Sequence, residues 1–168
     1  PMIALPMHPS NAFTIEELNA NLEDILHACE QDVQKLIGRK DVSLDLCSKI
    51  ENGKLRVDQG VIAGCAGGLY DSIYEAASIL KGHTGGCGDY ALSVYPGSQP
   101  IMMELVRTGV IHDLMASGAT VRTAFCGPCF GAGDVPANGA LSIRHTTRNF
   151  PSREGSKPGN GQLSGVAL

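Results

Sequence analysis

The 168-residue sequence contains no tryptophan, and aromatic residues make up only 5% of it. No apolar run approaches the roughly 20 residues that a membrane-spanning helix needs, which argues against a membrane protein. Lysines and arginines number 13 against 17 acidic residues and form no cluster, so nucleic acid is not expected as a partner. The segment Pro1–Pro6 lacks the basic start and long apolar core of a secretory signal.

Cysteine and glycine, by contrast, are well represented. Six cysteines without a secretory signal indicate a reducing compartment, which we expect to be the cytoplasm, where clustered cysteines bind metals or act in catalysis more often than they form disulfides. The 21 glycines predict many tight turns, or backbone that closely approaches a ligand. The chain starts at Pro1 rather than Met and ends in apolar Gly165–Leu168, so we expect a fragment of a longer protein.

Strands and helices are predicted to alternate along the chain. The clearest helix spans Thr14–Ile37, where Thr14 and Glu17 have capping-box spacing and Gly38 provides a stop. The expected strands are Met2–Leu5, Val61–Ala63, Ala91–Val94, Thr120–Ala124 and Leu141–His145, and further helices are expected at Leu69–Leu80, Ser98–Arg107 and Val110–Ala116. This alternation predicts one α/β domain over residues 1–168, a three-layer α/β/α fold with a mainly parallel sheet.

Residues with chemical potential follow the predicted strands. Cys65 comes after one strand, Pro96–Ser98 after the next, Cys126 and Cys129 after the third, and Arg148–Arg153 after the fourth. Ligands of such sheets bind outside the carboxyl ends of the strands. We therefore expect these groups to converge on one edge of the sheet.

Cys126–Gly127–Pro128–Cys129 is a CxxC pair, which can bind a metal or form a redox disulfide. With Cys65, three thiolates on one edge would suit a soft metal centre. A thioredoxin-like redox module is an alternative, but Gly131, Gly133 and Pro136 disfavour the long helix that follows the motif there.

A structural zinc module is a second alternative. It needs a fourth ligand, for which Cys87 or a histidine is available. Otherwise Cys47 and Cys87 are interpreted as ordinary thiols, and Cys29, on the apolar stripe of the first helix, as a packed core thiol. No pair of histidines shows ligand spacing.

Arg148 and Arg153 lie five residues apart on a predicted loop. Two guanidinium groups there could bind carboxylates through paired hydrogen bonds, and the simpler interpretation is two surface arginines. Their position beside the cysteines favours a binding role.

The ordered motifs resemble the aconitase and isopropylmalate dehydratase superfamily. The resemblance covers nearly the whole chain, and the motifs that carry it are Gly64–Cys65, Cys126–Gly131, Arg148–Arg153, Val94–Ser98 and Leu5–Ser10. It implies a [4Fe–4S] cluster held by Cys65, Cys126 and Cys129, and a hydro-lyase (hydratase or dehydratase) that acts on a small hydroxy-carboxylic acid. It also implies that Arg148 and Arg153 help to bind the substrate.

The same resemblance implies that the serine base and other catalytic groups lie on the remaining domains of the enzyme, so this domain is expected to be inactive alone. The chain departs from the family pattern at three places. Ala66–Gly67 stand where members usually carry Thr-Asn, Thr147 where they carry Asn, and Ser152 where they carry Gly. The first of these differences removes polar side chains near the expected cluster.

Overall fold

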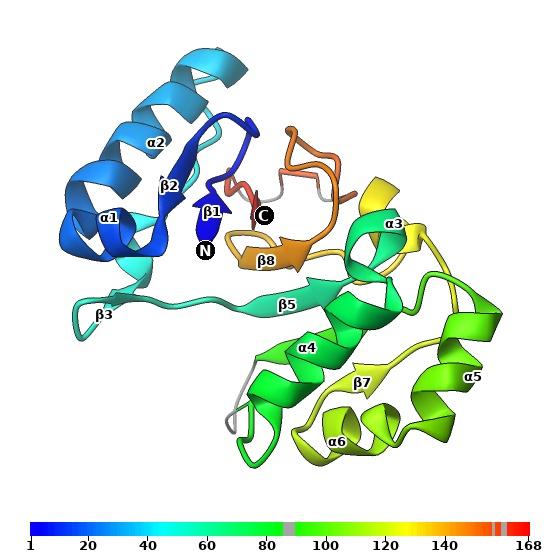
Figure 1. The fold of residues 1–168 in the computed structure, drawn as a ribbon. Helices are drawn as coiled ribbons and strands as arrows, with labels where there is room; N and C mark the ends of the chain where they lie inside the picture. The colour runs from blue at the N-terminus through cyan, green and yellow to red at the C-terminus, as the bar shows by residue number, and fades with distance from the viewer. Residues whose placement is uncertain (86–89, 156, 159–160) are drawn as a thin grey trace.

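A five-stranded parallel sheet forms the centre of the protein (Figure 1). The computed structural model describes residues 1–85, 90–155, 157–158 and 161–168. The strand order is β7-β6-β5-β8-β9, and every neighbouring pair is parallel. The strands are β5 (Gln59–Ile62), β6 (Ala91–Val94), β7 (Thr120–Val121), β8 (Leu141–His145) and β9 (Gly165–Ala167). This confirms the predicted α/β class with a parallel sheet.

Two short antiparallel pairs lie outside the sheet. Strand β1 (Met2–Ala4) pairs with β2 (Ala12–Thr14), and β3 (Ile50–Glu51) pairs with β4 (Lys54–Leu55). The β3–β4 hairpin turns through Asn52 and Gly53, which both have positive φ angles. Asn-Gly is the sequence that two-residue hairpin turns of this hand require.

The long helix predicted over Thr14–Ile37 is two helices, α1 (Ile15–Ala20) and α2 (Leu22–Ile37). The predicted capping box of Thr14 and Glu17 is present, and α2 ends at Gly38 in the left-handed conformation. The break falls at Asn21, whose φ of −132° is not helical. Asparagine is disfavoured in helix interiors because its side-chain amide competes for backbone hydrogen bonds. Here the side-chain amide of Asn21 donates to the Glu17 carbonyl.

The remaining helical segments include the three predicted helices and three short ones that were not predicted. The predicted helices are α4 (Tyr70–Leu80), α5 (Gln99–Arg107) and α6 (Val110–Ala116), and the short ones are η1 (Cys47–Lys49), α3 (Gly64–Gly67) and η2 (Gly127–Phe130). Among the described residues, no helix has the length and apolarity to cross a bilayer. Of the predicted strand Thr120–Ala124, only Thr120–Val121 (β7) pairs with β6, so this strand is shorter than expected.

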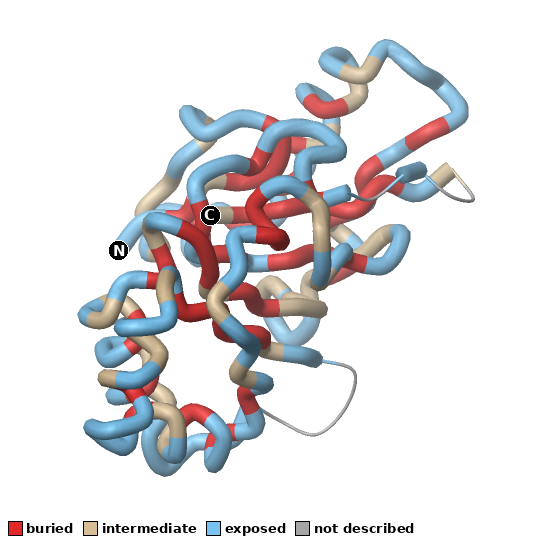
Figure 2. The backbone as a smooth tube through the Cα atoms, turned by 90° about the vertical axis from the view of Figure 1, so that its right-hand side faces the viewer, coloured by how far each residue is buried: buried red, intermediate tan, exposed pale blue. Residues whose placement is uncertain are grey.

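Two apolar cores flank the sheet. One joins α1 and α2 to β1 and to the ends of β8 and β9, through residues such as Leu26, Leu141 and Ala167. The other joins α4, α5 and α6 to β6, through residues such as Ile73 and Val94. Figure 1 shows the two helical groups on opposite sides of β5 and β8, and Figure 2 shows the buried segments gathered inside the exposed loops. The sheet is thereby held as a rigid base for the loops at its ends.

A buried ion pair ties η1 to the start of the sheet. Lys49 is only 6% exposed, and its Nζ lies 2.6 Å from Oδ2 of Asp58. The same oxygen accepts the backbone N–H of Leu141 at 2.8 Å. Burial alone would raise the pKa of Asp58, but the hydrogen bonds from Lys49 and Leu141 hold it below its usual value.

Lys49→Met is expected to lower the free energy of unfolding by about 3 kcal/mol at neutral pH, because it leaves a partly buried carboxylate without its main partner. The pKa of Asp58 is lower in the folded than in the unfolded state, so its contribution is present above the unfolded pKa, roughly 3.9. That contribution is lost as the pH falls through the folded-state value. Urea unfolding at pH 7 and below pH 4 should therefore show a difference between wild type and variant that shrinks in acid.

The matched control is Lys35→Met, whose ion pair with Asp32 is exposed. It should change the free energy of unfolding by about 0–1 kcal/mol. An equal effect of both substitutions would contradict a special role for the buried pair.

Candidate functional site

The three cysteines of the predicted cluster follow strand ends at one edge of the sheet. Cys65 lies in α3, directly after the central strand β5. Cys126 and Cys129 lie in the loop after β7, where η2 contains Cys129. The segments α3 and η2 are in direct contact, and they lie side by side in Figure 1. The structure therefore brings together cysteines that are 61 residues apart in the sequence.

The backbone at Gly64 touches the thiols of the second segment. A Cβ atom added there would stand 2.5 Å from Sγ of Cys129 and 3.9 Å from Sγ of Cys126. Gly64 also has a φ of 75°, which side chains other than glycine rarely adopt. Glycine before Cys65 is thus needed for both conformation and space. We call Cys65, Cys126 and Cys129 the cysteine rim.

The rim thiols differ in exposure and influence one another. Cys65 and Cys126 are exposed, whereas Cys129 is buried. Burial raises the pKa of the Cys129 thiol to about 11, and the neighbouring thiols of Cys126 and Cys65 add to this effect because thiolates repel one another. A bound cationic centre would instead stabilise the thiolates, because the thiolate is the form that binds metal.

The rim is spread more widely than the ligands of a single ion. Across the described ranges, only His27, Glu30 and Cys47 place three ligand atoms within 4.8 Å of one another, and no rim thiol belongs to such a group. A mononuclear zinc site draws all four of its ligands close, because each lies about 2.0–2.3 Å from the metal. The described rim residues do not have this spacing, which disfavours the zinc-module alternative. Cys87 lies outside the described residues.

The segment after the CxxC pair also differs from a thioredoxin-like module. Helix η2 covers only Gly127–Phe130 and ends at Gly131, which has a left-handed φ of 84°. The long helix that supports the thiol pair in thioredoxin-like proteins is therefore replaced by a single short turn.

Arg153 lies beside the rim. Its Nε donates to the carbonyl oxygen of Cys129 at 3.0 Å. The two loops also touch at their glycines, because a Cβ on Gly131 would stand 2.6 Å from Cα of Gly155. Arg153 is exposed.

Arg148 is placed differently. It is exposed, and its Nη1 donates to Oγ1 of Thr147 at 3.0 Å, within its own loop. The next residue, Asn149, is buried and donates to the carbonyl oxygen of Leu5 at 2.6 Å. The backbone N–H of Met7 in turn donates to the Asn149 carbonyl at 2.9 Å. Asn149 therefore anchors the arginine loop to the N-terminal segment.

A buried arginine that the sequence pattern did not predict braces the rim. Arg144 on β8 is 3% exposed. Its Nη1 donates to the carbonyl oxygen of Pro128, inside the CxxC pair, at 2.8 Å. Its Nη2 donates to the carbonyl oxygen of Asp134 at 2.6 Å and to Oε1 of Gln59 at 3.1 Å, and its Nε donates to Oγ of Ser142 at 3.0 Å.

Burial lowers the pKa of Arg144, and the carboxylates of Glu154 and Asp134 oppose that shift. Arg144 pairs with Val61 across β5 and β8, so its side chain leaves the sheet on the same face as Val61. The sequence did offer one signal, which is the charged Arg144 inside a strand-like segment. An arginine in a buried strand is rarely found without hydrogen-bond partners, so such partners could have been expected.

A second set of contacts, centred on Asp134, fixes the loop that follows η2. The hydroxyl of Tyr95 donates to Oδ2 of Asp134 at 2.6 Å, and Arg122 lies 3.6 Å from Oδ1. Burial and then this carboxylate raise the pKa of Tyr95 to about 12. Tyr95 follows β6, so the loop that carries Cys126 and Cys129 is tied to β5, β6 and β8 together.

A known protein family matches the whole chain. The family model of the aconitase family (aconitate hydratase) matches residues 1–168. The 3-isopropylmalate dehydratase large subunit of Desulfitobacterium hafniense (strain Y51) is 37% identical over 121 residues, which are 71% of this chain and 28% of that protein. The large subunit from Caldanaerobacter subterraneus subsp. tengcongensis is 30% identical over 154 residues, which are 89% of this chain and 36% of that protein. The chain thus spans about a third of the length of these relatives.

Proposed function

We propose, since this chain belongs to the aconitase family, that it carries the iron–sulfur site of a hydro-lyase acting on a small hydroxy-carboxylic acid. The observation that carries the proposal is the cysteine rim: three thiols from two distant segments meet, spread more widely than the ligands of one ion. Iron–sulfur clusters are held by cysteine thiolates, usually four, so a [4Fe–4S] cluster held by only three would leave its fourth iron open.

The rim residues fit a [4Fe–4S] cluster by donor chemistry and by space. Cys65, Cys126 and Cys129 would hold it, and Gly64 leaves room where any side chain would press on the thiols. When bound, the cluster supplies a Lewis-acidic iron that polarises the hydroxyl group to be removed. The protein keeps the three thiols in place through Arg144 and Asp134, which hold the CxxC loop on the sheet.

Arg153 is proposed to bind a substrate carboxylate. Its Nε donates to the Cys129 carbonyl, which holds the side chain beside the rim. The two Nη groups are then proposed to face the substrate. Such a planar fork suits a carboxylate. Arg148 is proposed to bind the substrate from the other end of the same loop, with Asn149 anchoring the loop between them.

The rest of the active site is proposed to come from outside this chain. The relatives are named large subunits and are about two and a half times as long. The chain supplies thiols and arginines at an open edge of the sheet, and the described rim residues Cys65 and Cys126 are exposed. A further domain or subunit would cover this edge, exclude water and supply the base that removes the substrate proton.

The proposed function is tested on the full-length protein after anaerobic reconstitution with iron and sulfide. Iron and sulfide content and the electron paramagnetic resonance spectrum report the cluster. Dehydration of 3-isopropylmalate and other small hydroxy acids is followed by the ultraviolet absorption of the unsaturated product. Failure to retain iron would overturn the cluster assignment, and a loaded protein that acts on none of these acids would overturn the activity.

Arg153→Ala in the full-length enzyme is expected to lower kcat/KM by roughly 10- to 150-fold, since a charge-assisted hydrogen bond to a carboxylate contributes about 1.5–3 kcal/mol. The melting temperature should fall by less than about 4 °C, because the side chain is exposed and one hydrogen bond to a backbone carbonyl contributes about 1 kcal/mol. Steady-state kinetics, iron content and thermal unfolding are measured together.

The matched control is Arg107→Ala, an exposed arginine of α5 that pairs with Glu104. It should leave kcat/KM unchanged. A large fall in melting temperature with intact turnover in Arg153→Ala would make Arg153 a structural residue, and loss of iron alone would move it from substrate binding to cluster retention.

A further inference from the structure

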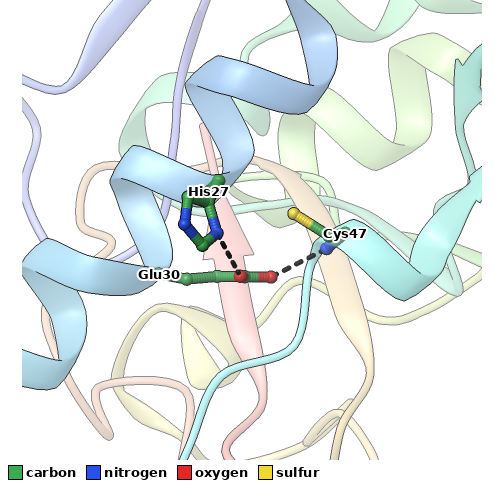
Figure 3. Close-up of side chains that lie close together, drawn as sticks. All are labelled: His27, Glu30 and Cys47. Atoms are coloured by element: carbon green, nitrogen blue, oxygen red, sulfur yellow. Dashed lines mark hydrogen bonds and ion pairs between the residues drawn. The ribbon is translucent and has the colours of Figure 1, made fainter.

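We propose that His27, Glu30 and Cys47 form a second metal site, separate from the cysteine rim, which takes a borderline-soft divalent cation of the zinc class (Figure 3). One imidazole nitrogen, one carboxylate oxygen and one thiol sulfur meet there, all within 4.8 Å of one another. Within the described ranges this is the only such group of three. The proposal does not depend on the proposed function, because none of these residues belongs to the rim.

Two elements bring the three ligands together. His27 and Glu30 are three residues apart on α2, so they share one face of that helix. Cys47 begins η1, which packs against α2. Figure 3 shows the His27 ring and the Cys47 side chain on either side of the Glu30 carboxylate.

The Glu30 carboxylate is already fixed in place. Its Oε1 accepts the backbone N–H of Leu46 at 2.5 Å and that of Cys47 at 2.8 Å. Its Oε2 lies 3.8 Å from Nδ1 of His27. One oxygen thus holds the start of η1 against α2, and the other faces the histidine, where a cation could bind between them.

The spacing requires only small side-chain movements. Ligand atoms of a tetrahedral zinc site stand roughly 3.3–3.7 Å apart, given bond lengths of about 2.0–2.3 Å. Movements of about 1 Å, within the reach of side-chain rotation on a fixed backbone, would bring the three atoms to that spacing. His27 is 63% exposed, so solvent can enter and a water molecule can complete the coordination.

The donors and the surrounding charges select the cation. A thiolate and an imidazole suit zinc-class ions, whereas calcium and magnesium prefer oxygen ligands alone. Burial, and then the carboxylates of Glu30, Asp45 and Glu23, raise the pKa of the Cys47 thiol to about 11. The same acidic surroundings attract a cation, which would favour the thiolate in turn.

The second nitrogen of His27 also has a partner. The side-chain amide of Gln31 meets Nε2 of His27 at 2.9 Å. The oxygen and nitrogen of such an amide exchange places by a half-turn. With its oxygen toward the ring, Gln31 would accept the Nε2 proton and leave Nδ1 free for the metal, which is the usual arrangement at metal-bound histidines.

The site would act as a clamp between α2 and η1. The segment from Gly38 to Leu46 connects these elements, and the bound cation would add one centre that joins them directly. We therefore expect zinc to raise the melting temperature of the chain, since a ligand that binds only the folded state stabilises it.

The first test measures the full chain with its rim loaded with iron and sulfide. After incubation with Zn²⁺ and desalting, metal analysis should find one equivalent of zinc in addition to iron. Cys47→Ser should lose that zinc with unchanged iron, and His112→Ala, an exposed histidine on α6, should keep it. Absence of zinc in the wild type, or zinc that survives Cys47→Ser, would overturn the proposal.

The second test removes the rim as a competing site by replacing Cys65, Cys126 and Cys129 with serine. Titration with Co²⁺ should produce a thiolate-to-cobalt charge-transfer band that saturates at one equivalent. Cys47→Ser in this background should abolish the band. His27→Ala should weaken Co²⁺ binding by more than the roughly 10- to 100-fold typical of a lost outer-shell partner. A band that persists without Cys47, or that is indifferent to His27, would contradict the site.

Discussion

Cys126→Ser in the full-length protein is expected to abolish iron retention and to lower turnover by at least roughly 1000-fold. Removal of one rim thiolate leaves two, which cannot hold the proposed cluster, and that cluster would supply Lewis-acid stabilisation of several kcal/mol. Because Cys126 is exposed, the apo-protein should keep its stability to within about 0.5 kcal/mol. Iron and sulfide content, turnover and the melting temperature of the apo-protein are the three measurements.

The matched control is Cys29→Ala. Cys29 lies on the buried face of α2 and is 3% exposed, and burial raises its pKa to about 11, as expected of a packed thiol. This variant is expected to lose some stability while it keeps full iron content. If Cys126→Ser retained both iron and turnover, Cys126 could not be a ligand of the cluster.

Arg144→Met is expected to lower the free energy of unfolding by about 3–5 kcal/mol, which corresponds to a fall in melting temperature of about 6–20 °C for a chain of this size. Methionine fills similar space but makes none of the four hydrogen bonds to Pro128, Asp134, Gln59 and Ser142. The buried Pro128 carbonyl would lose this donor, and a buried unpaired acceptor costs about 1–3 kcal/mol, whereas the Asp134 carbonyl and Oε1 of Gln59 keep a second donor each.

The same substitution should loosen the cysteine rim. Cys129 is buried, so a thiol reagent should modify it slowly in the wild-type apo-protein and faster in Arg144→Met, below the temperature of global unfolding. Arg144→Lys should rescue this only in part, since one ammonium group cannot reproduce the fork. Arg122→Met removes a half-exposed arginine from the same loop and should cost about 0–1 kcal/mol. Equal effects at 122 and 144 would show that burial of Arg144 has no special role.

The convergence of the cysteines could be predicted from the sequence because it depends on general properties of parallel sheets. The strands ending before Cys65 and Cys126 were visible as short apolar runs between glycine-rich turns, and parallel strands place their carboxyl ends at one edge. The capping box at Thr14 and the stop at Gly38 were local signals that needed no knowledge of the tertiary fold.

The supports of the site could not be predicted in the same way. Arg144 contacts Pro128, Asp134 and Gln59, which are distant in the sequence, and only the strand register places them within hydrogen-bonding range. Likewise, His27 and Glu30 meet Cys47 because η1 folds back on α2. The segment that connects these two elements has no helical or strand-like spacing of apolar residues from which this contact could be predicted. The break at Asn21 was missed because the apolar spacing continues across it.

The central position of β5 has a consequence for the order in which the protein is made. Cys65 emerges from the ribosome early, but β5 obtains its second neighbour only when β8 has been synthesised. That delay covers about 80 residues, or roughly 4–16 seconds of translation at common elongation rates. Until then Arg144 cannot brace the CxxC loop, and the thiols at 65, 126 and 129 stay on unassembled segments. Iron delivery to the nascent chain would therefore be premature, and cluster insertion is expected to follow completion of the sheet.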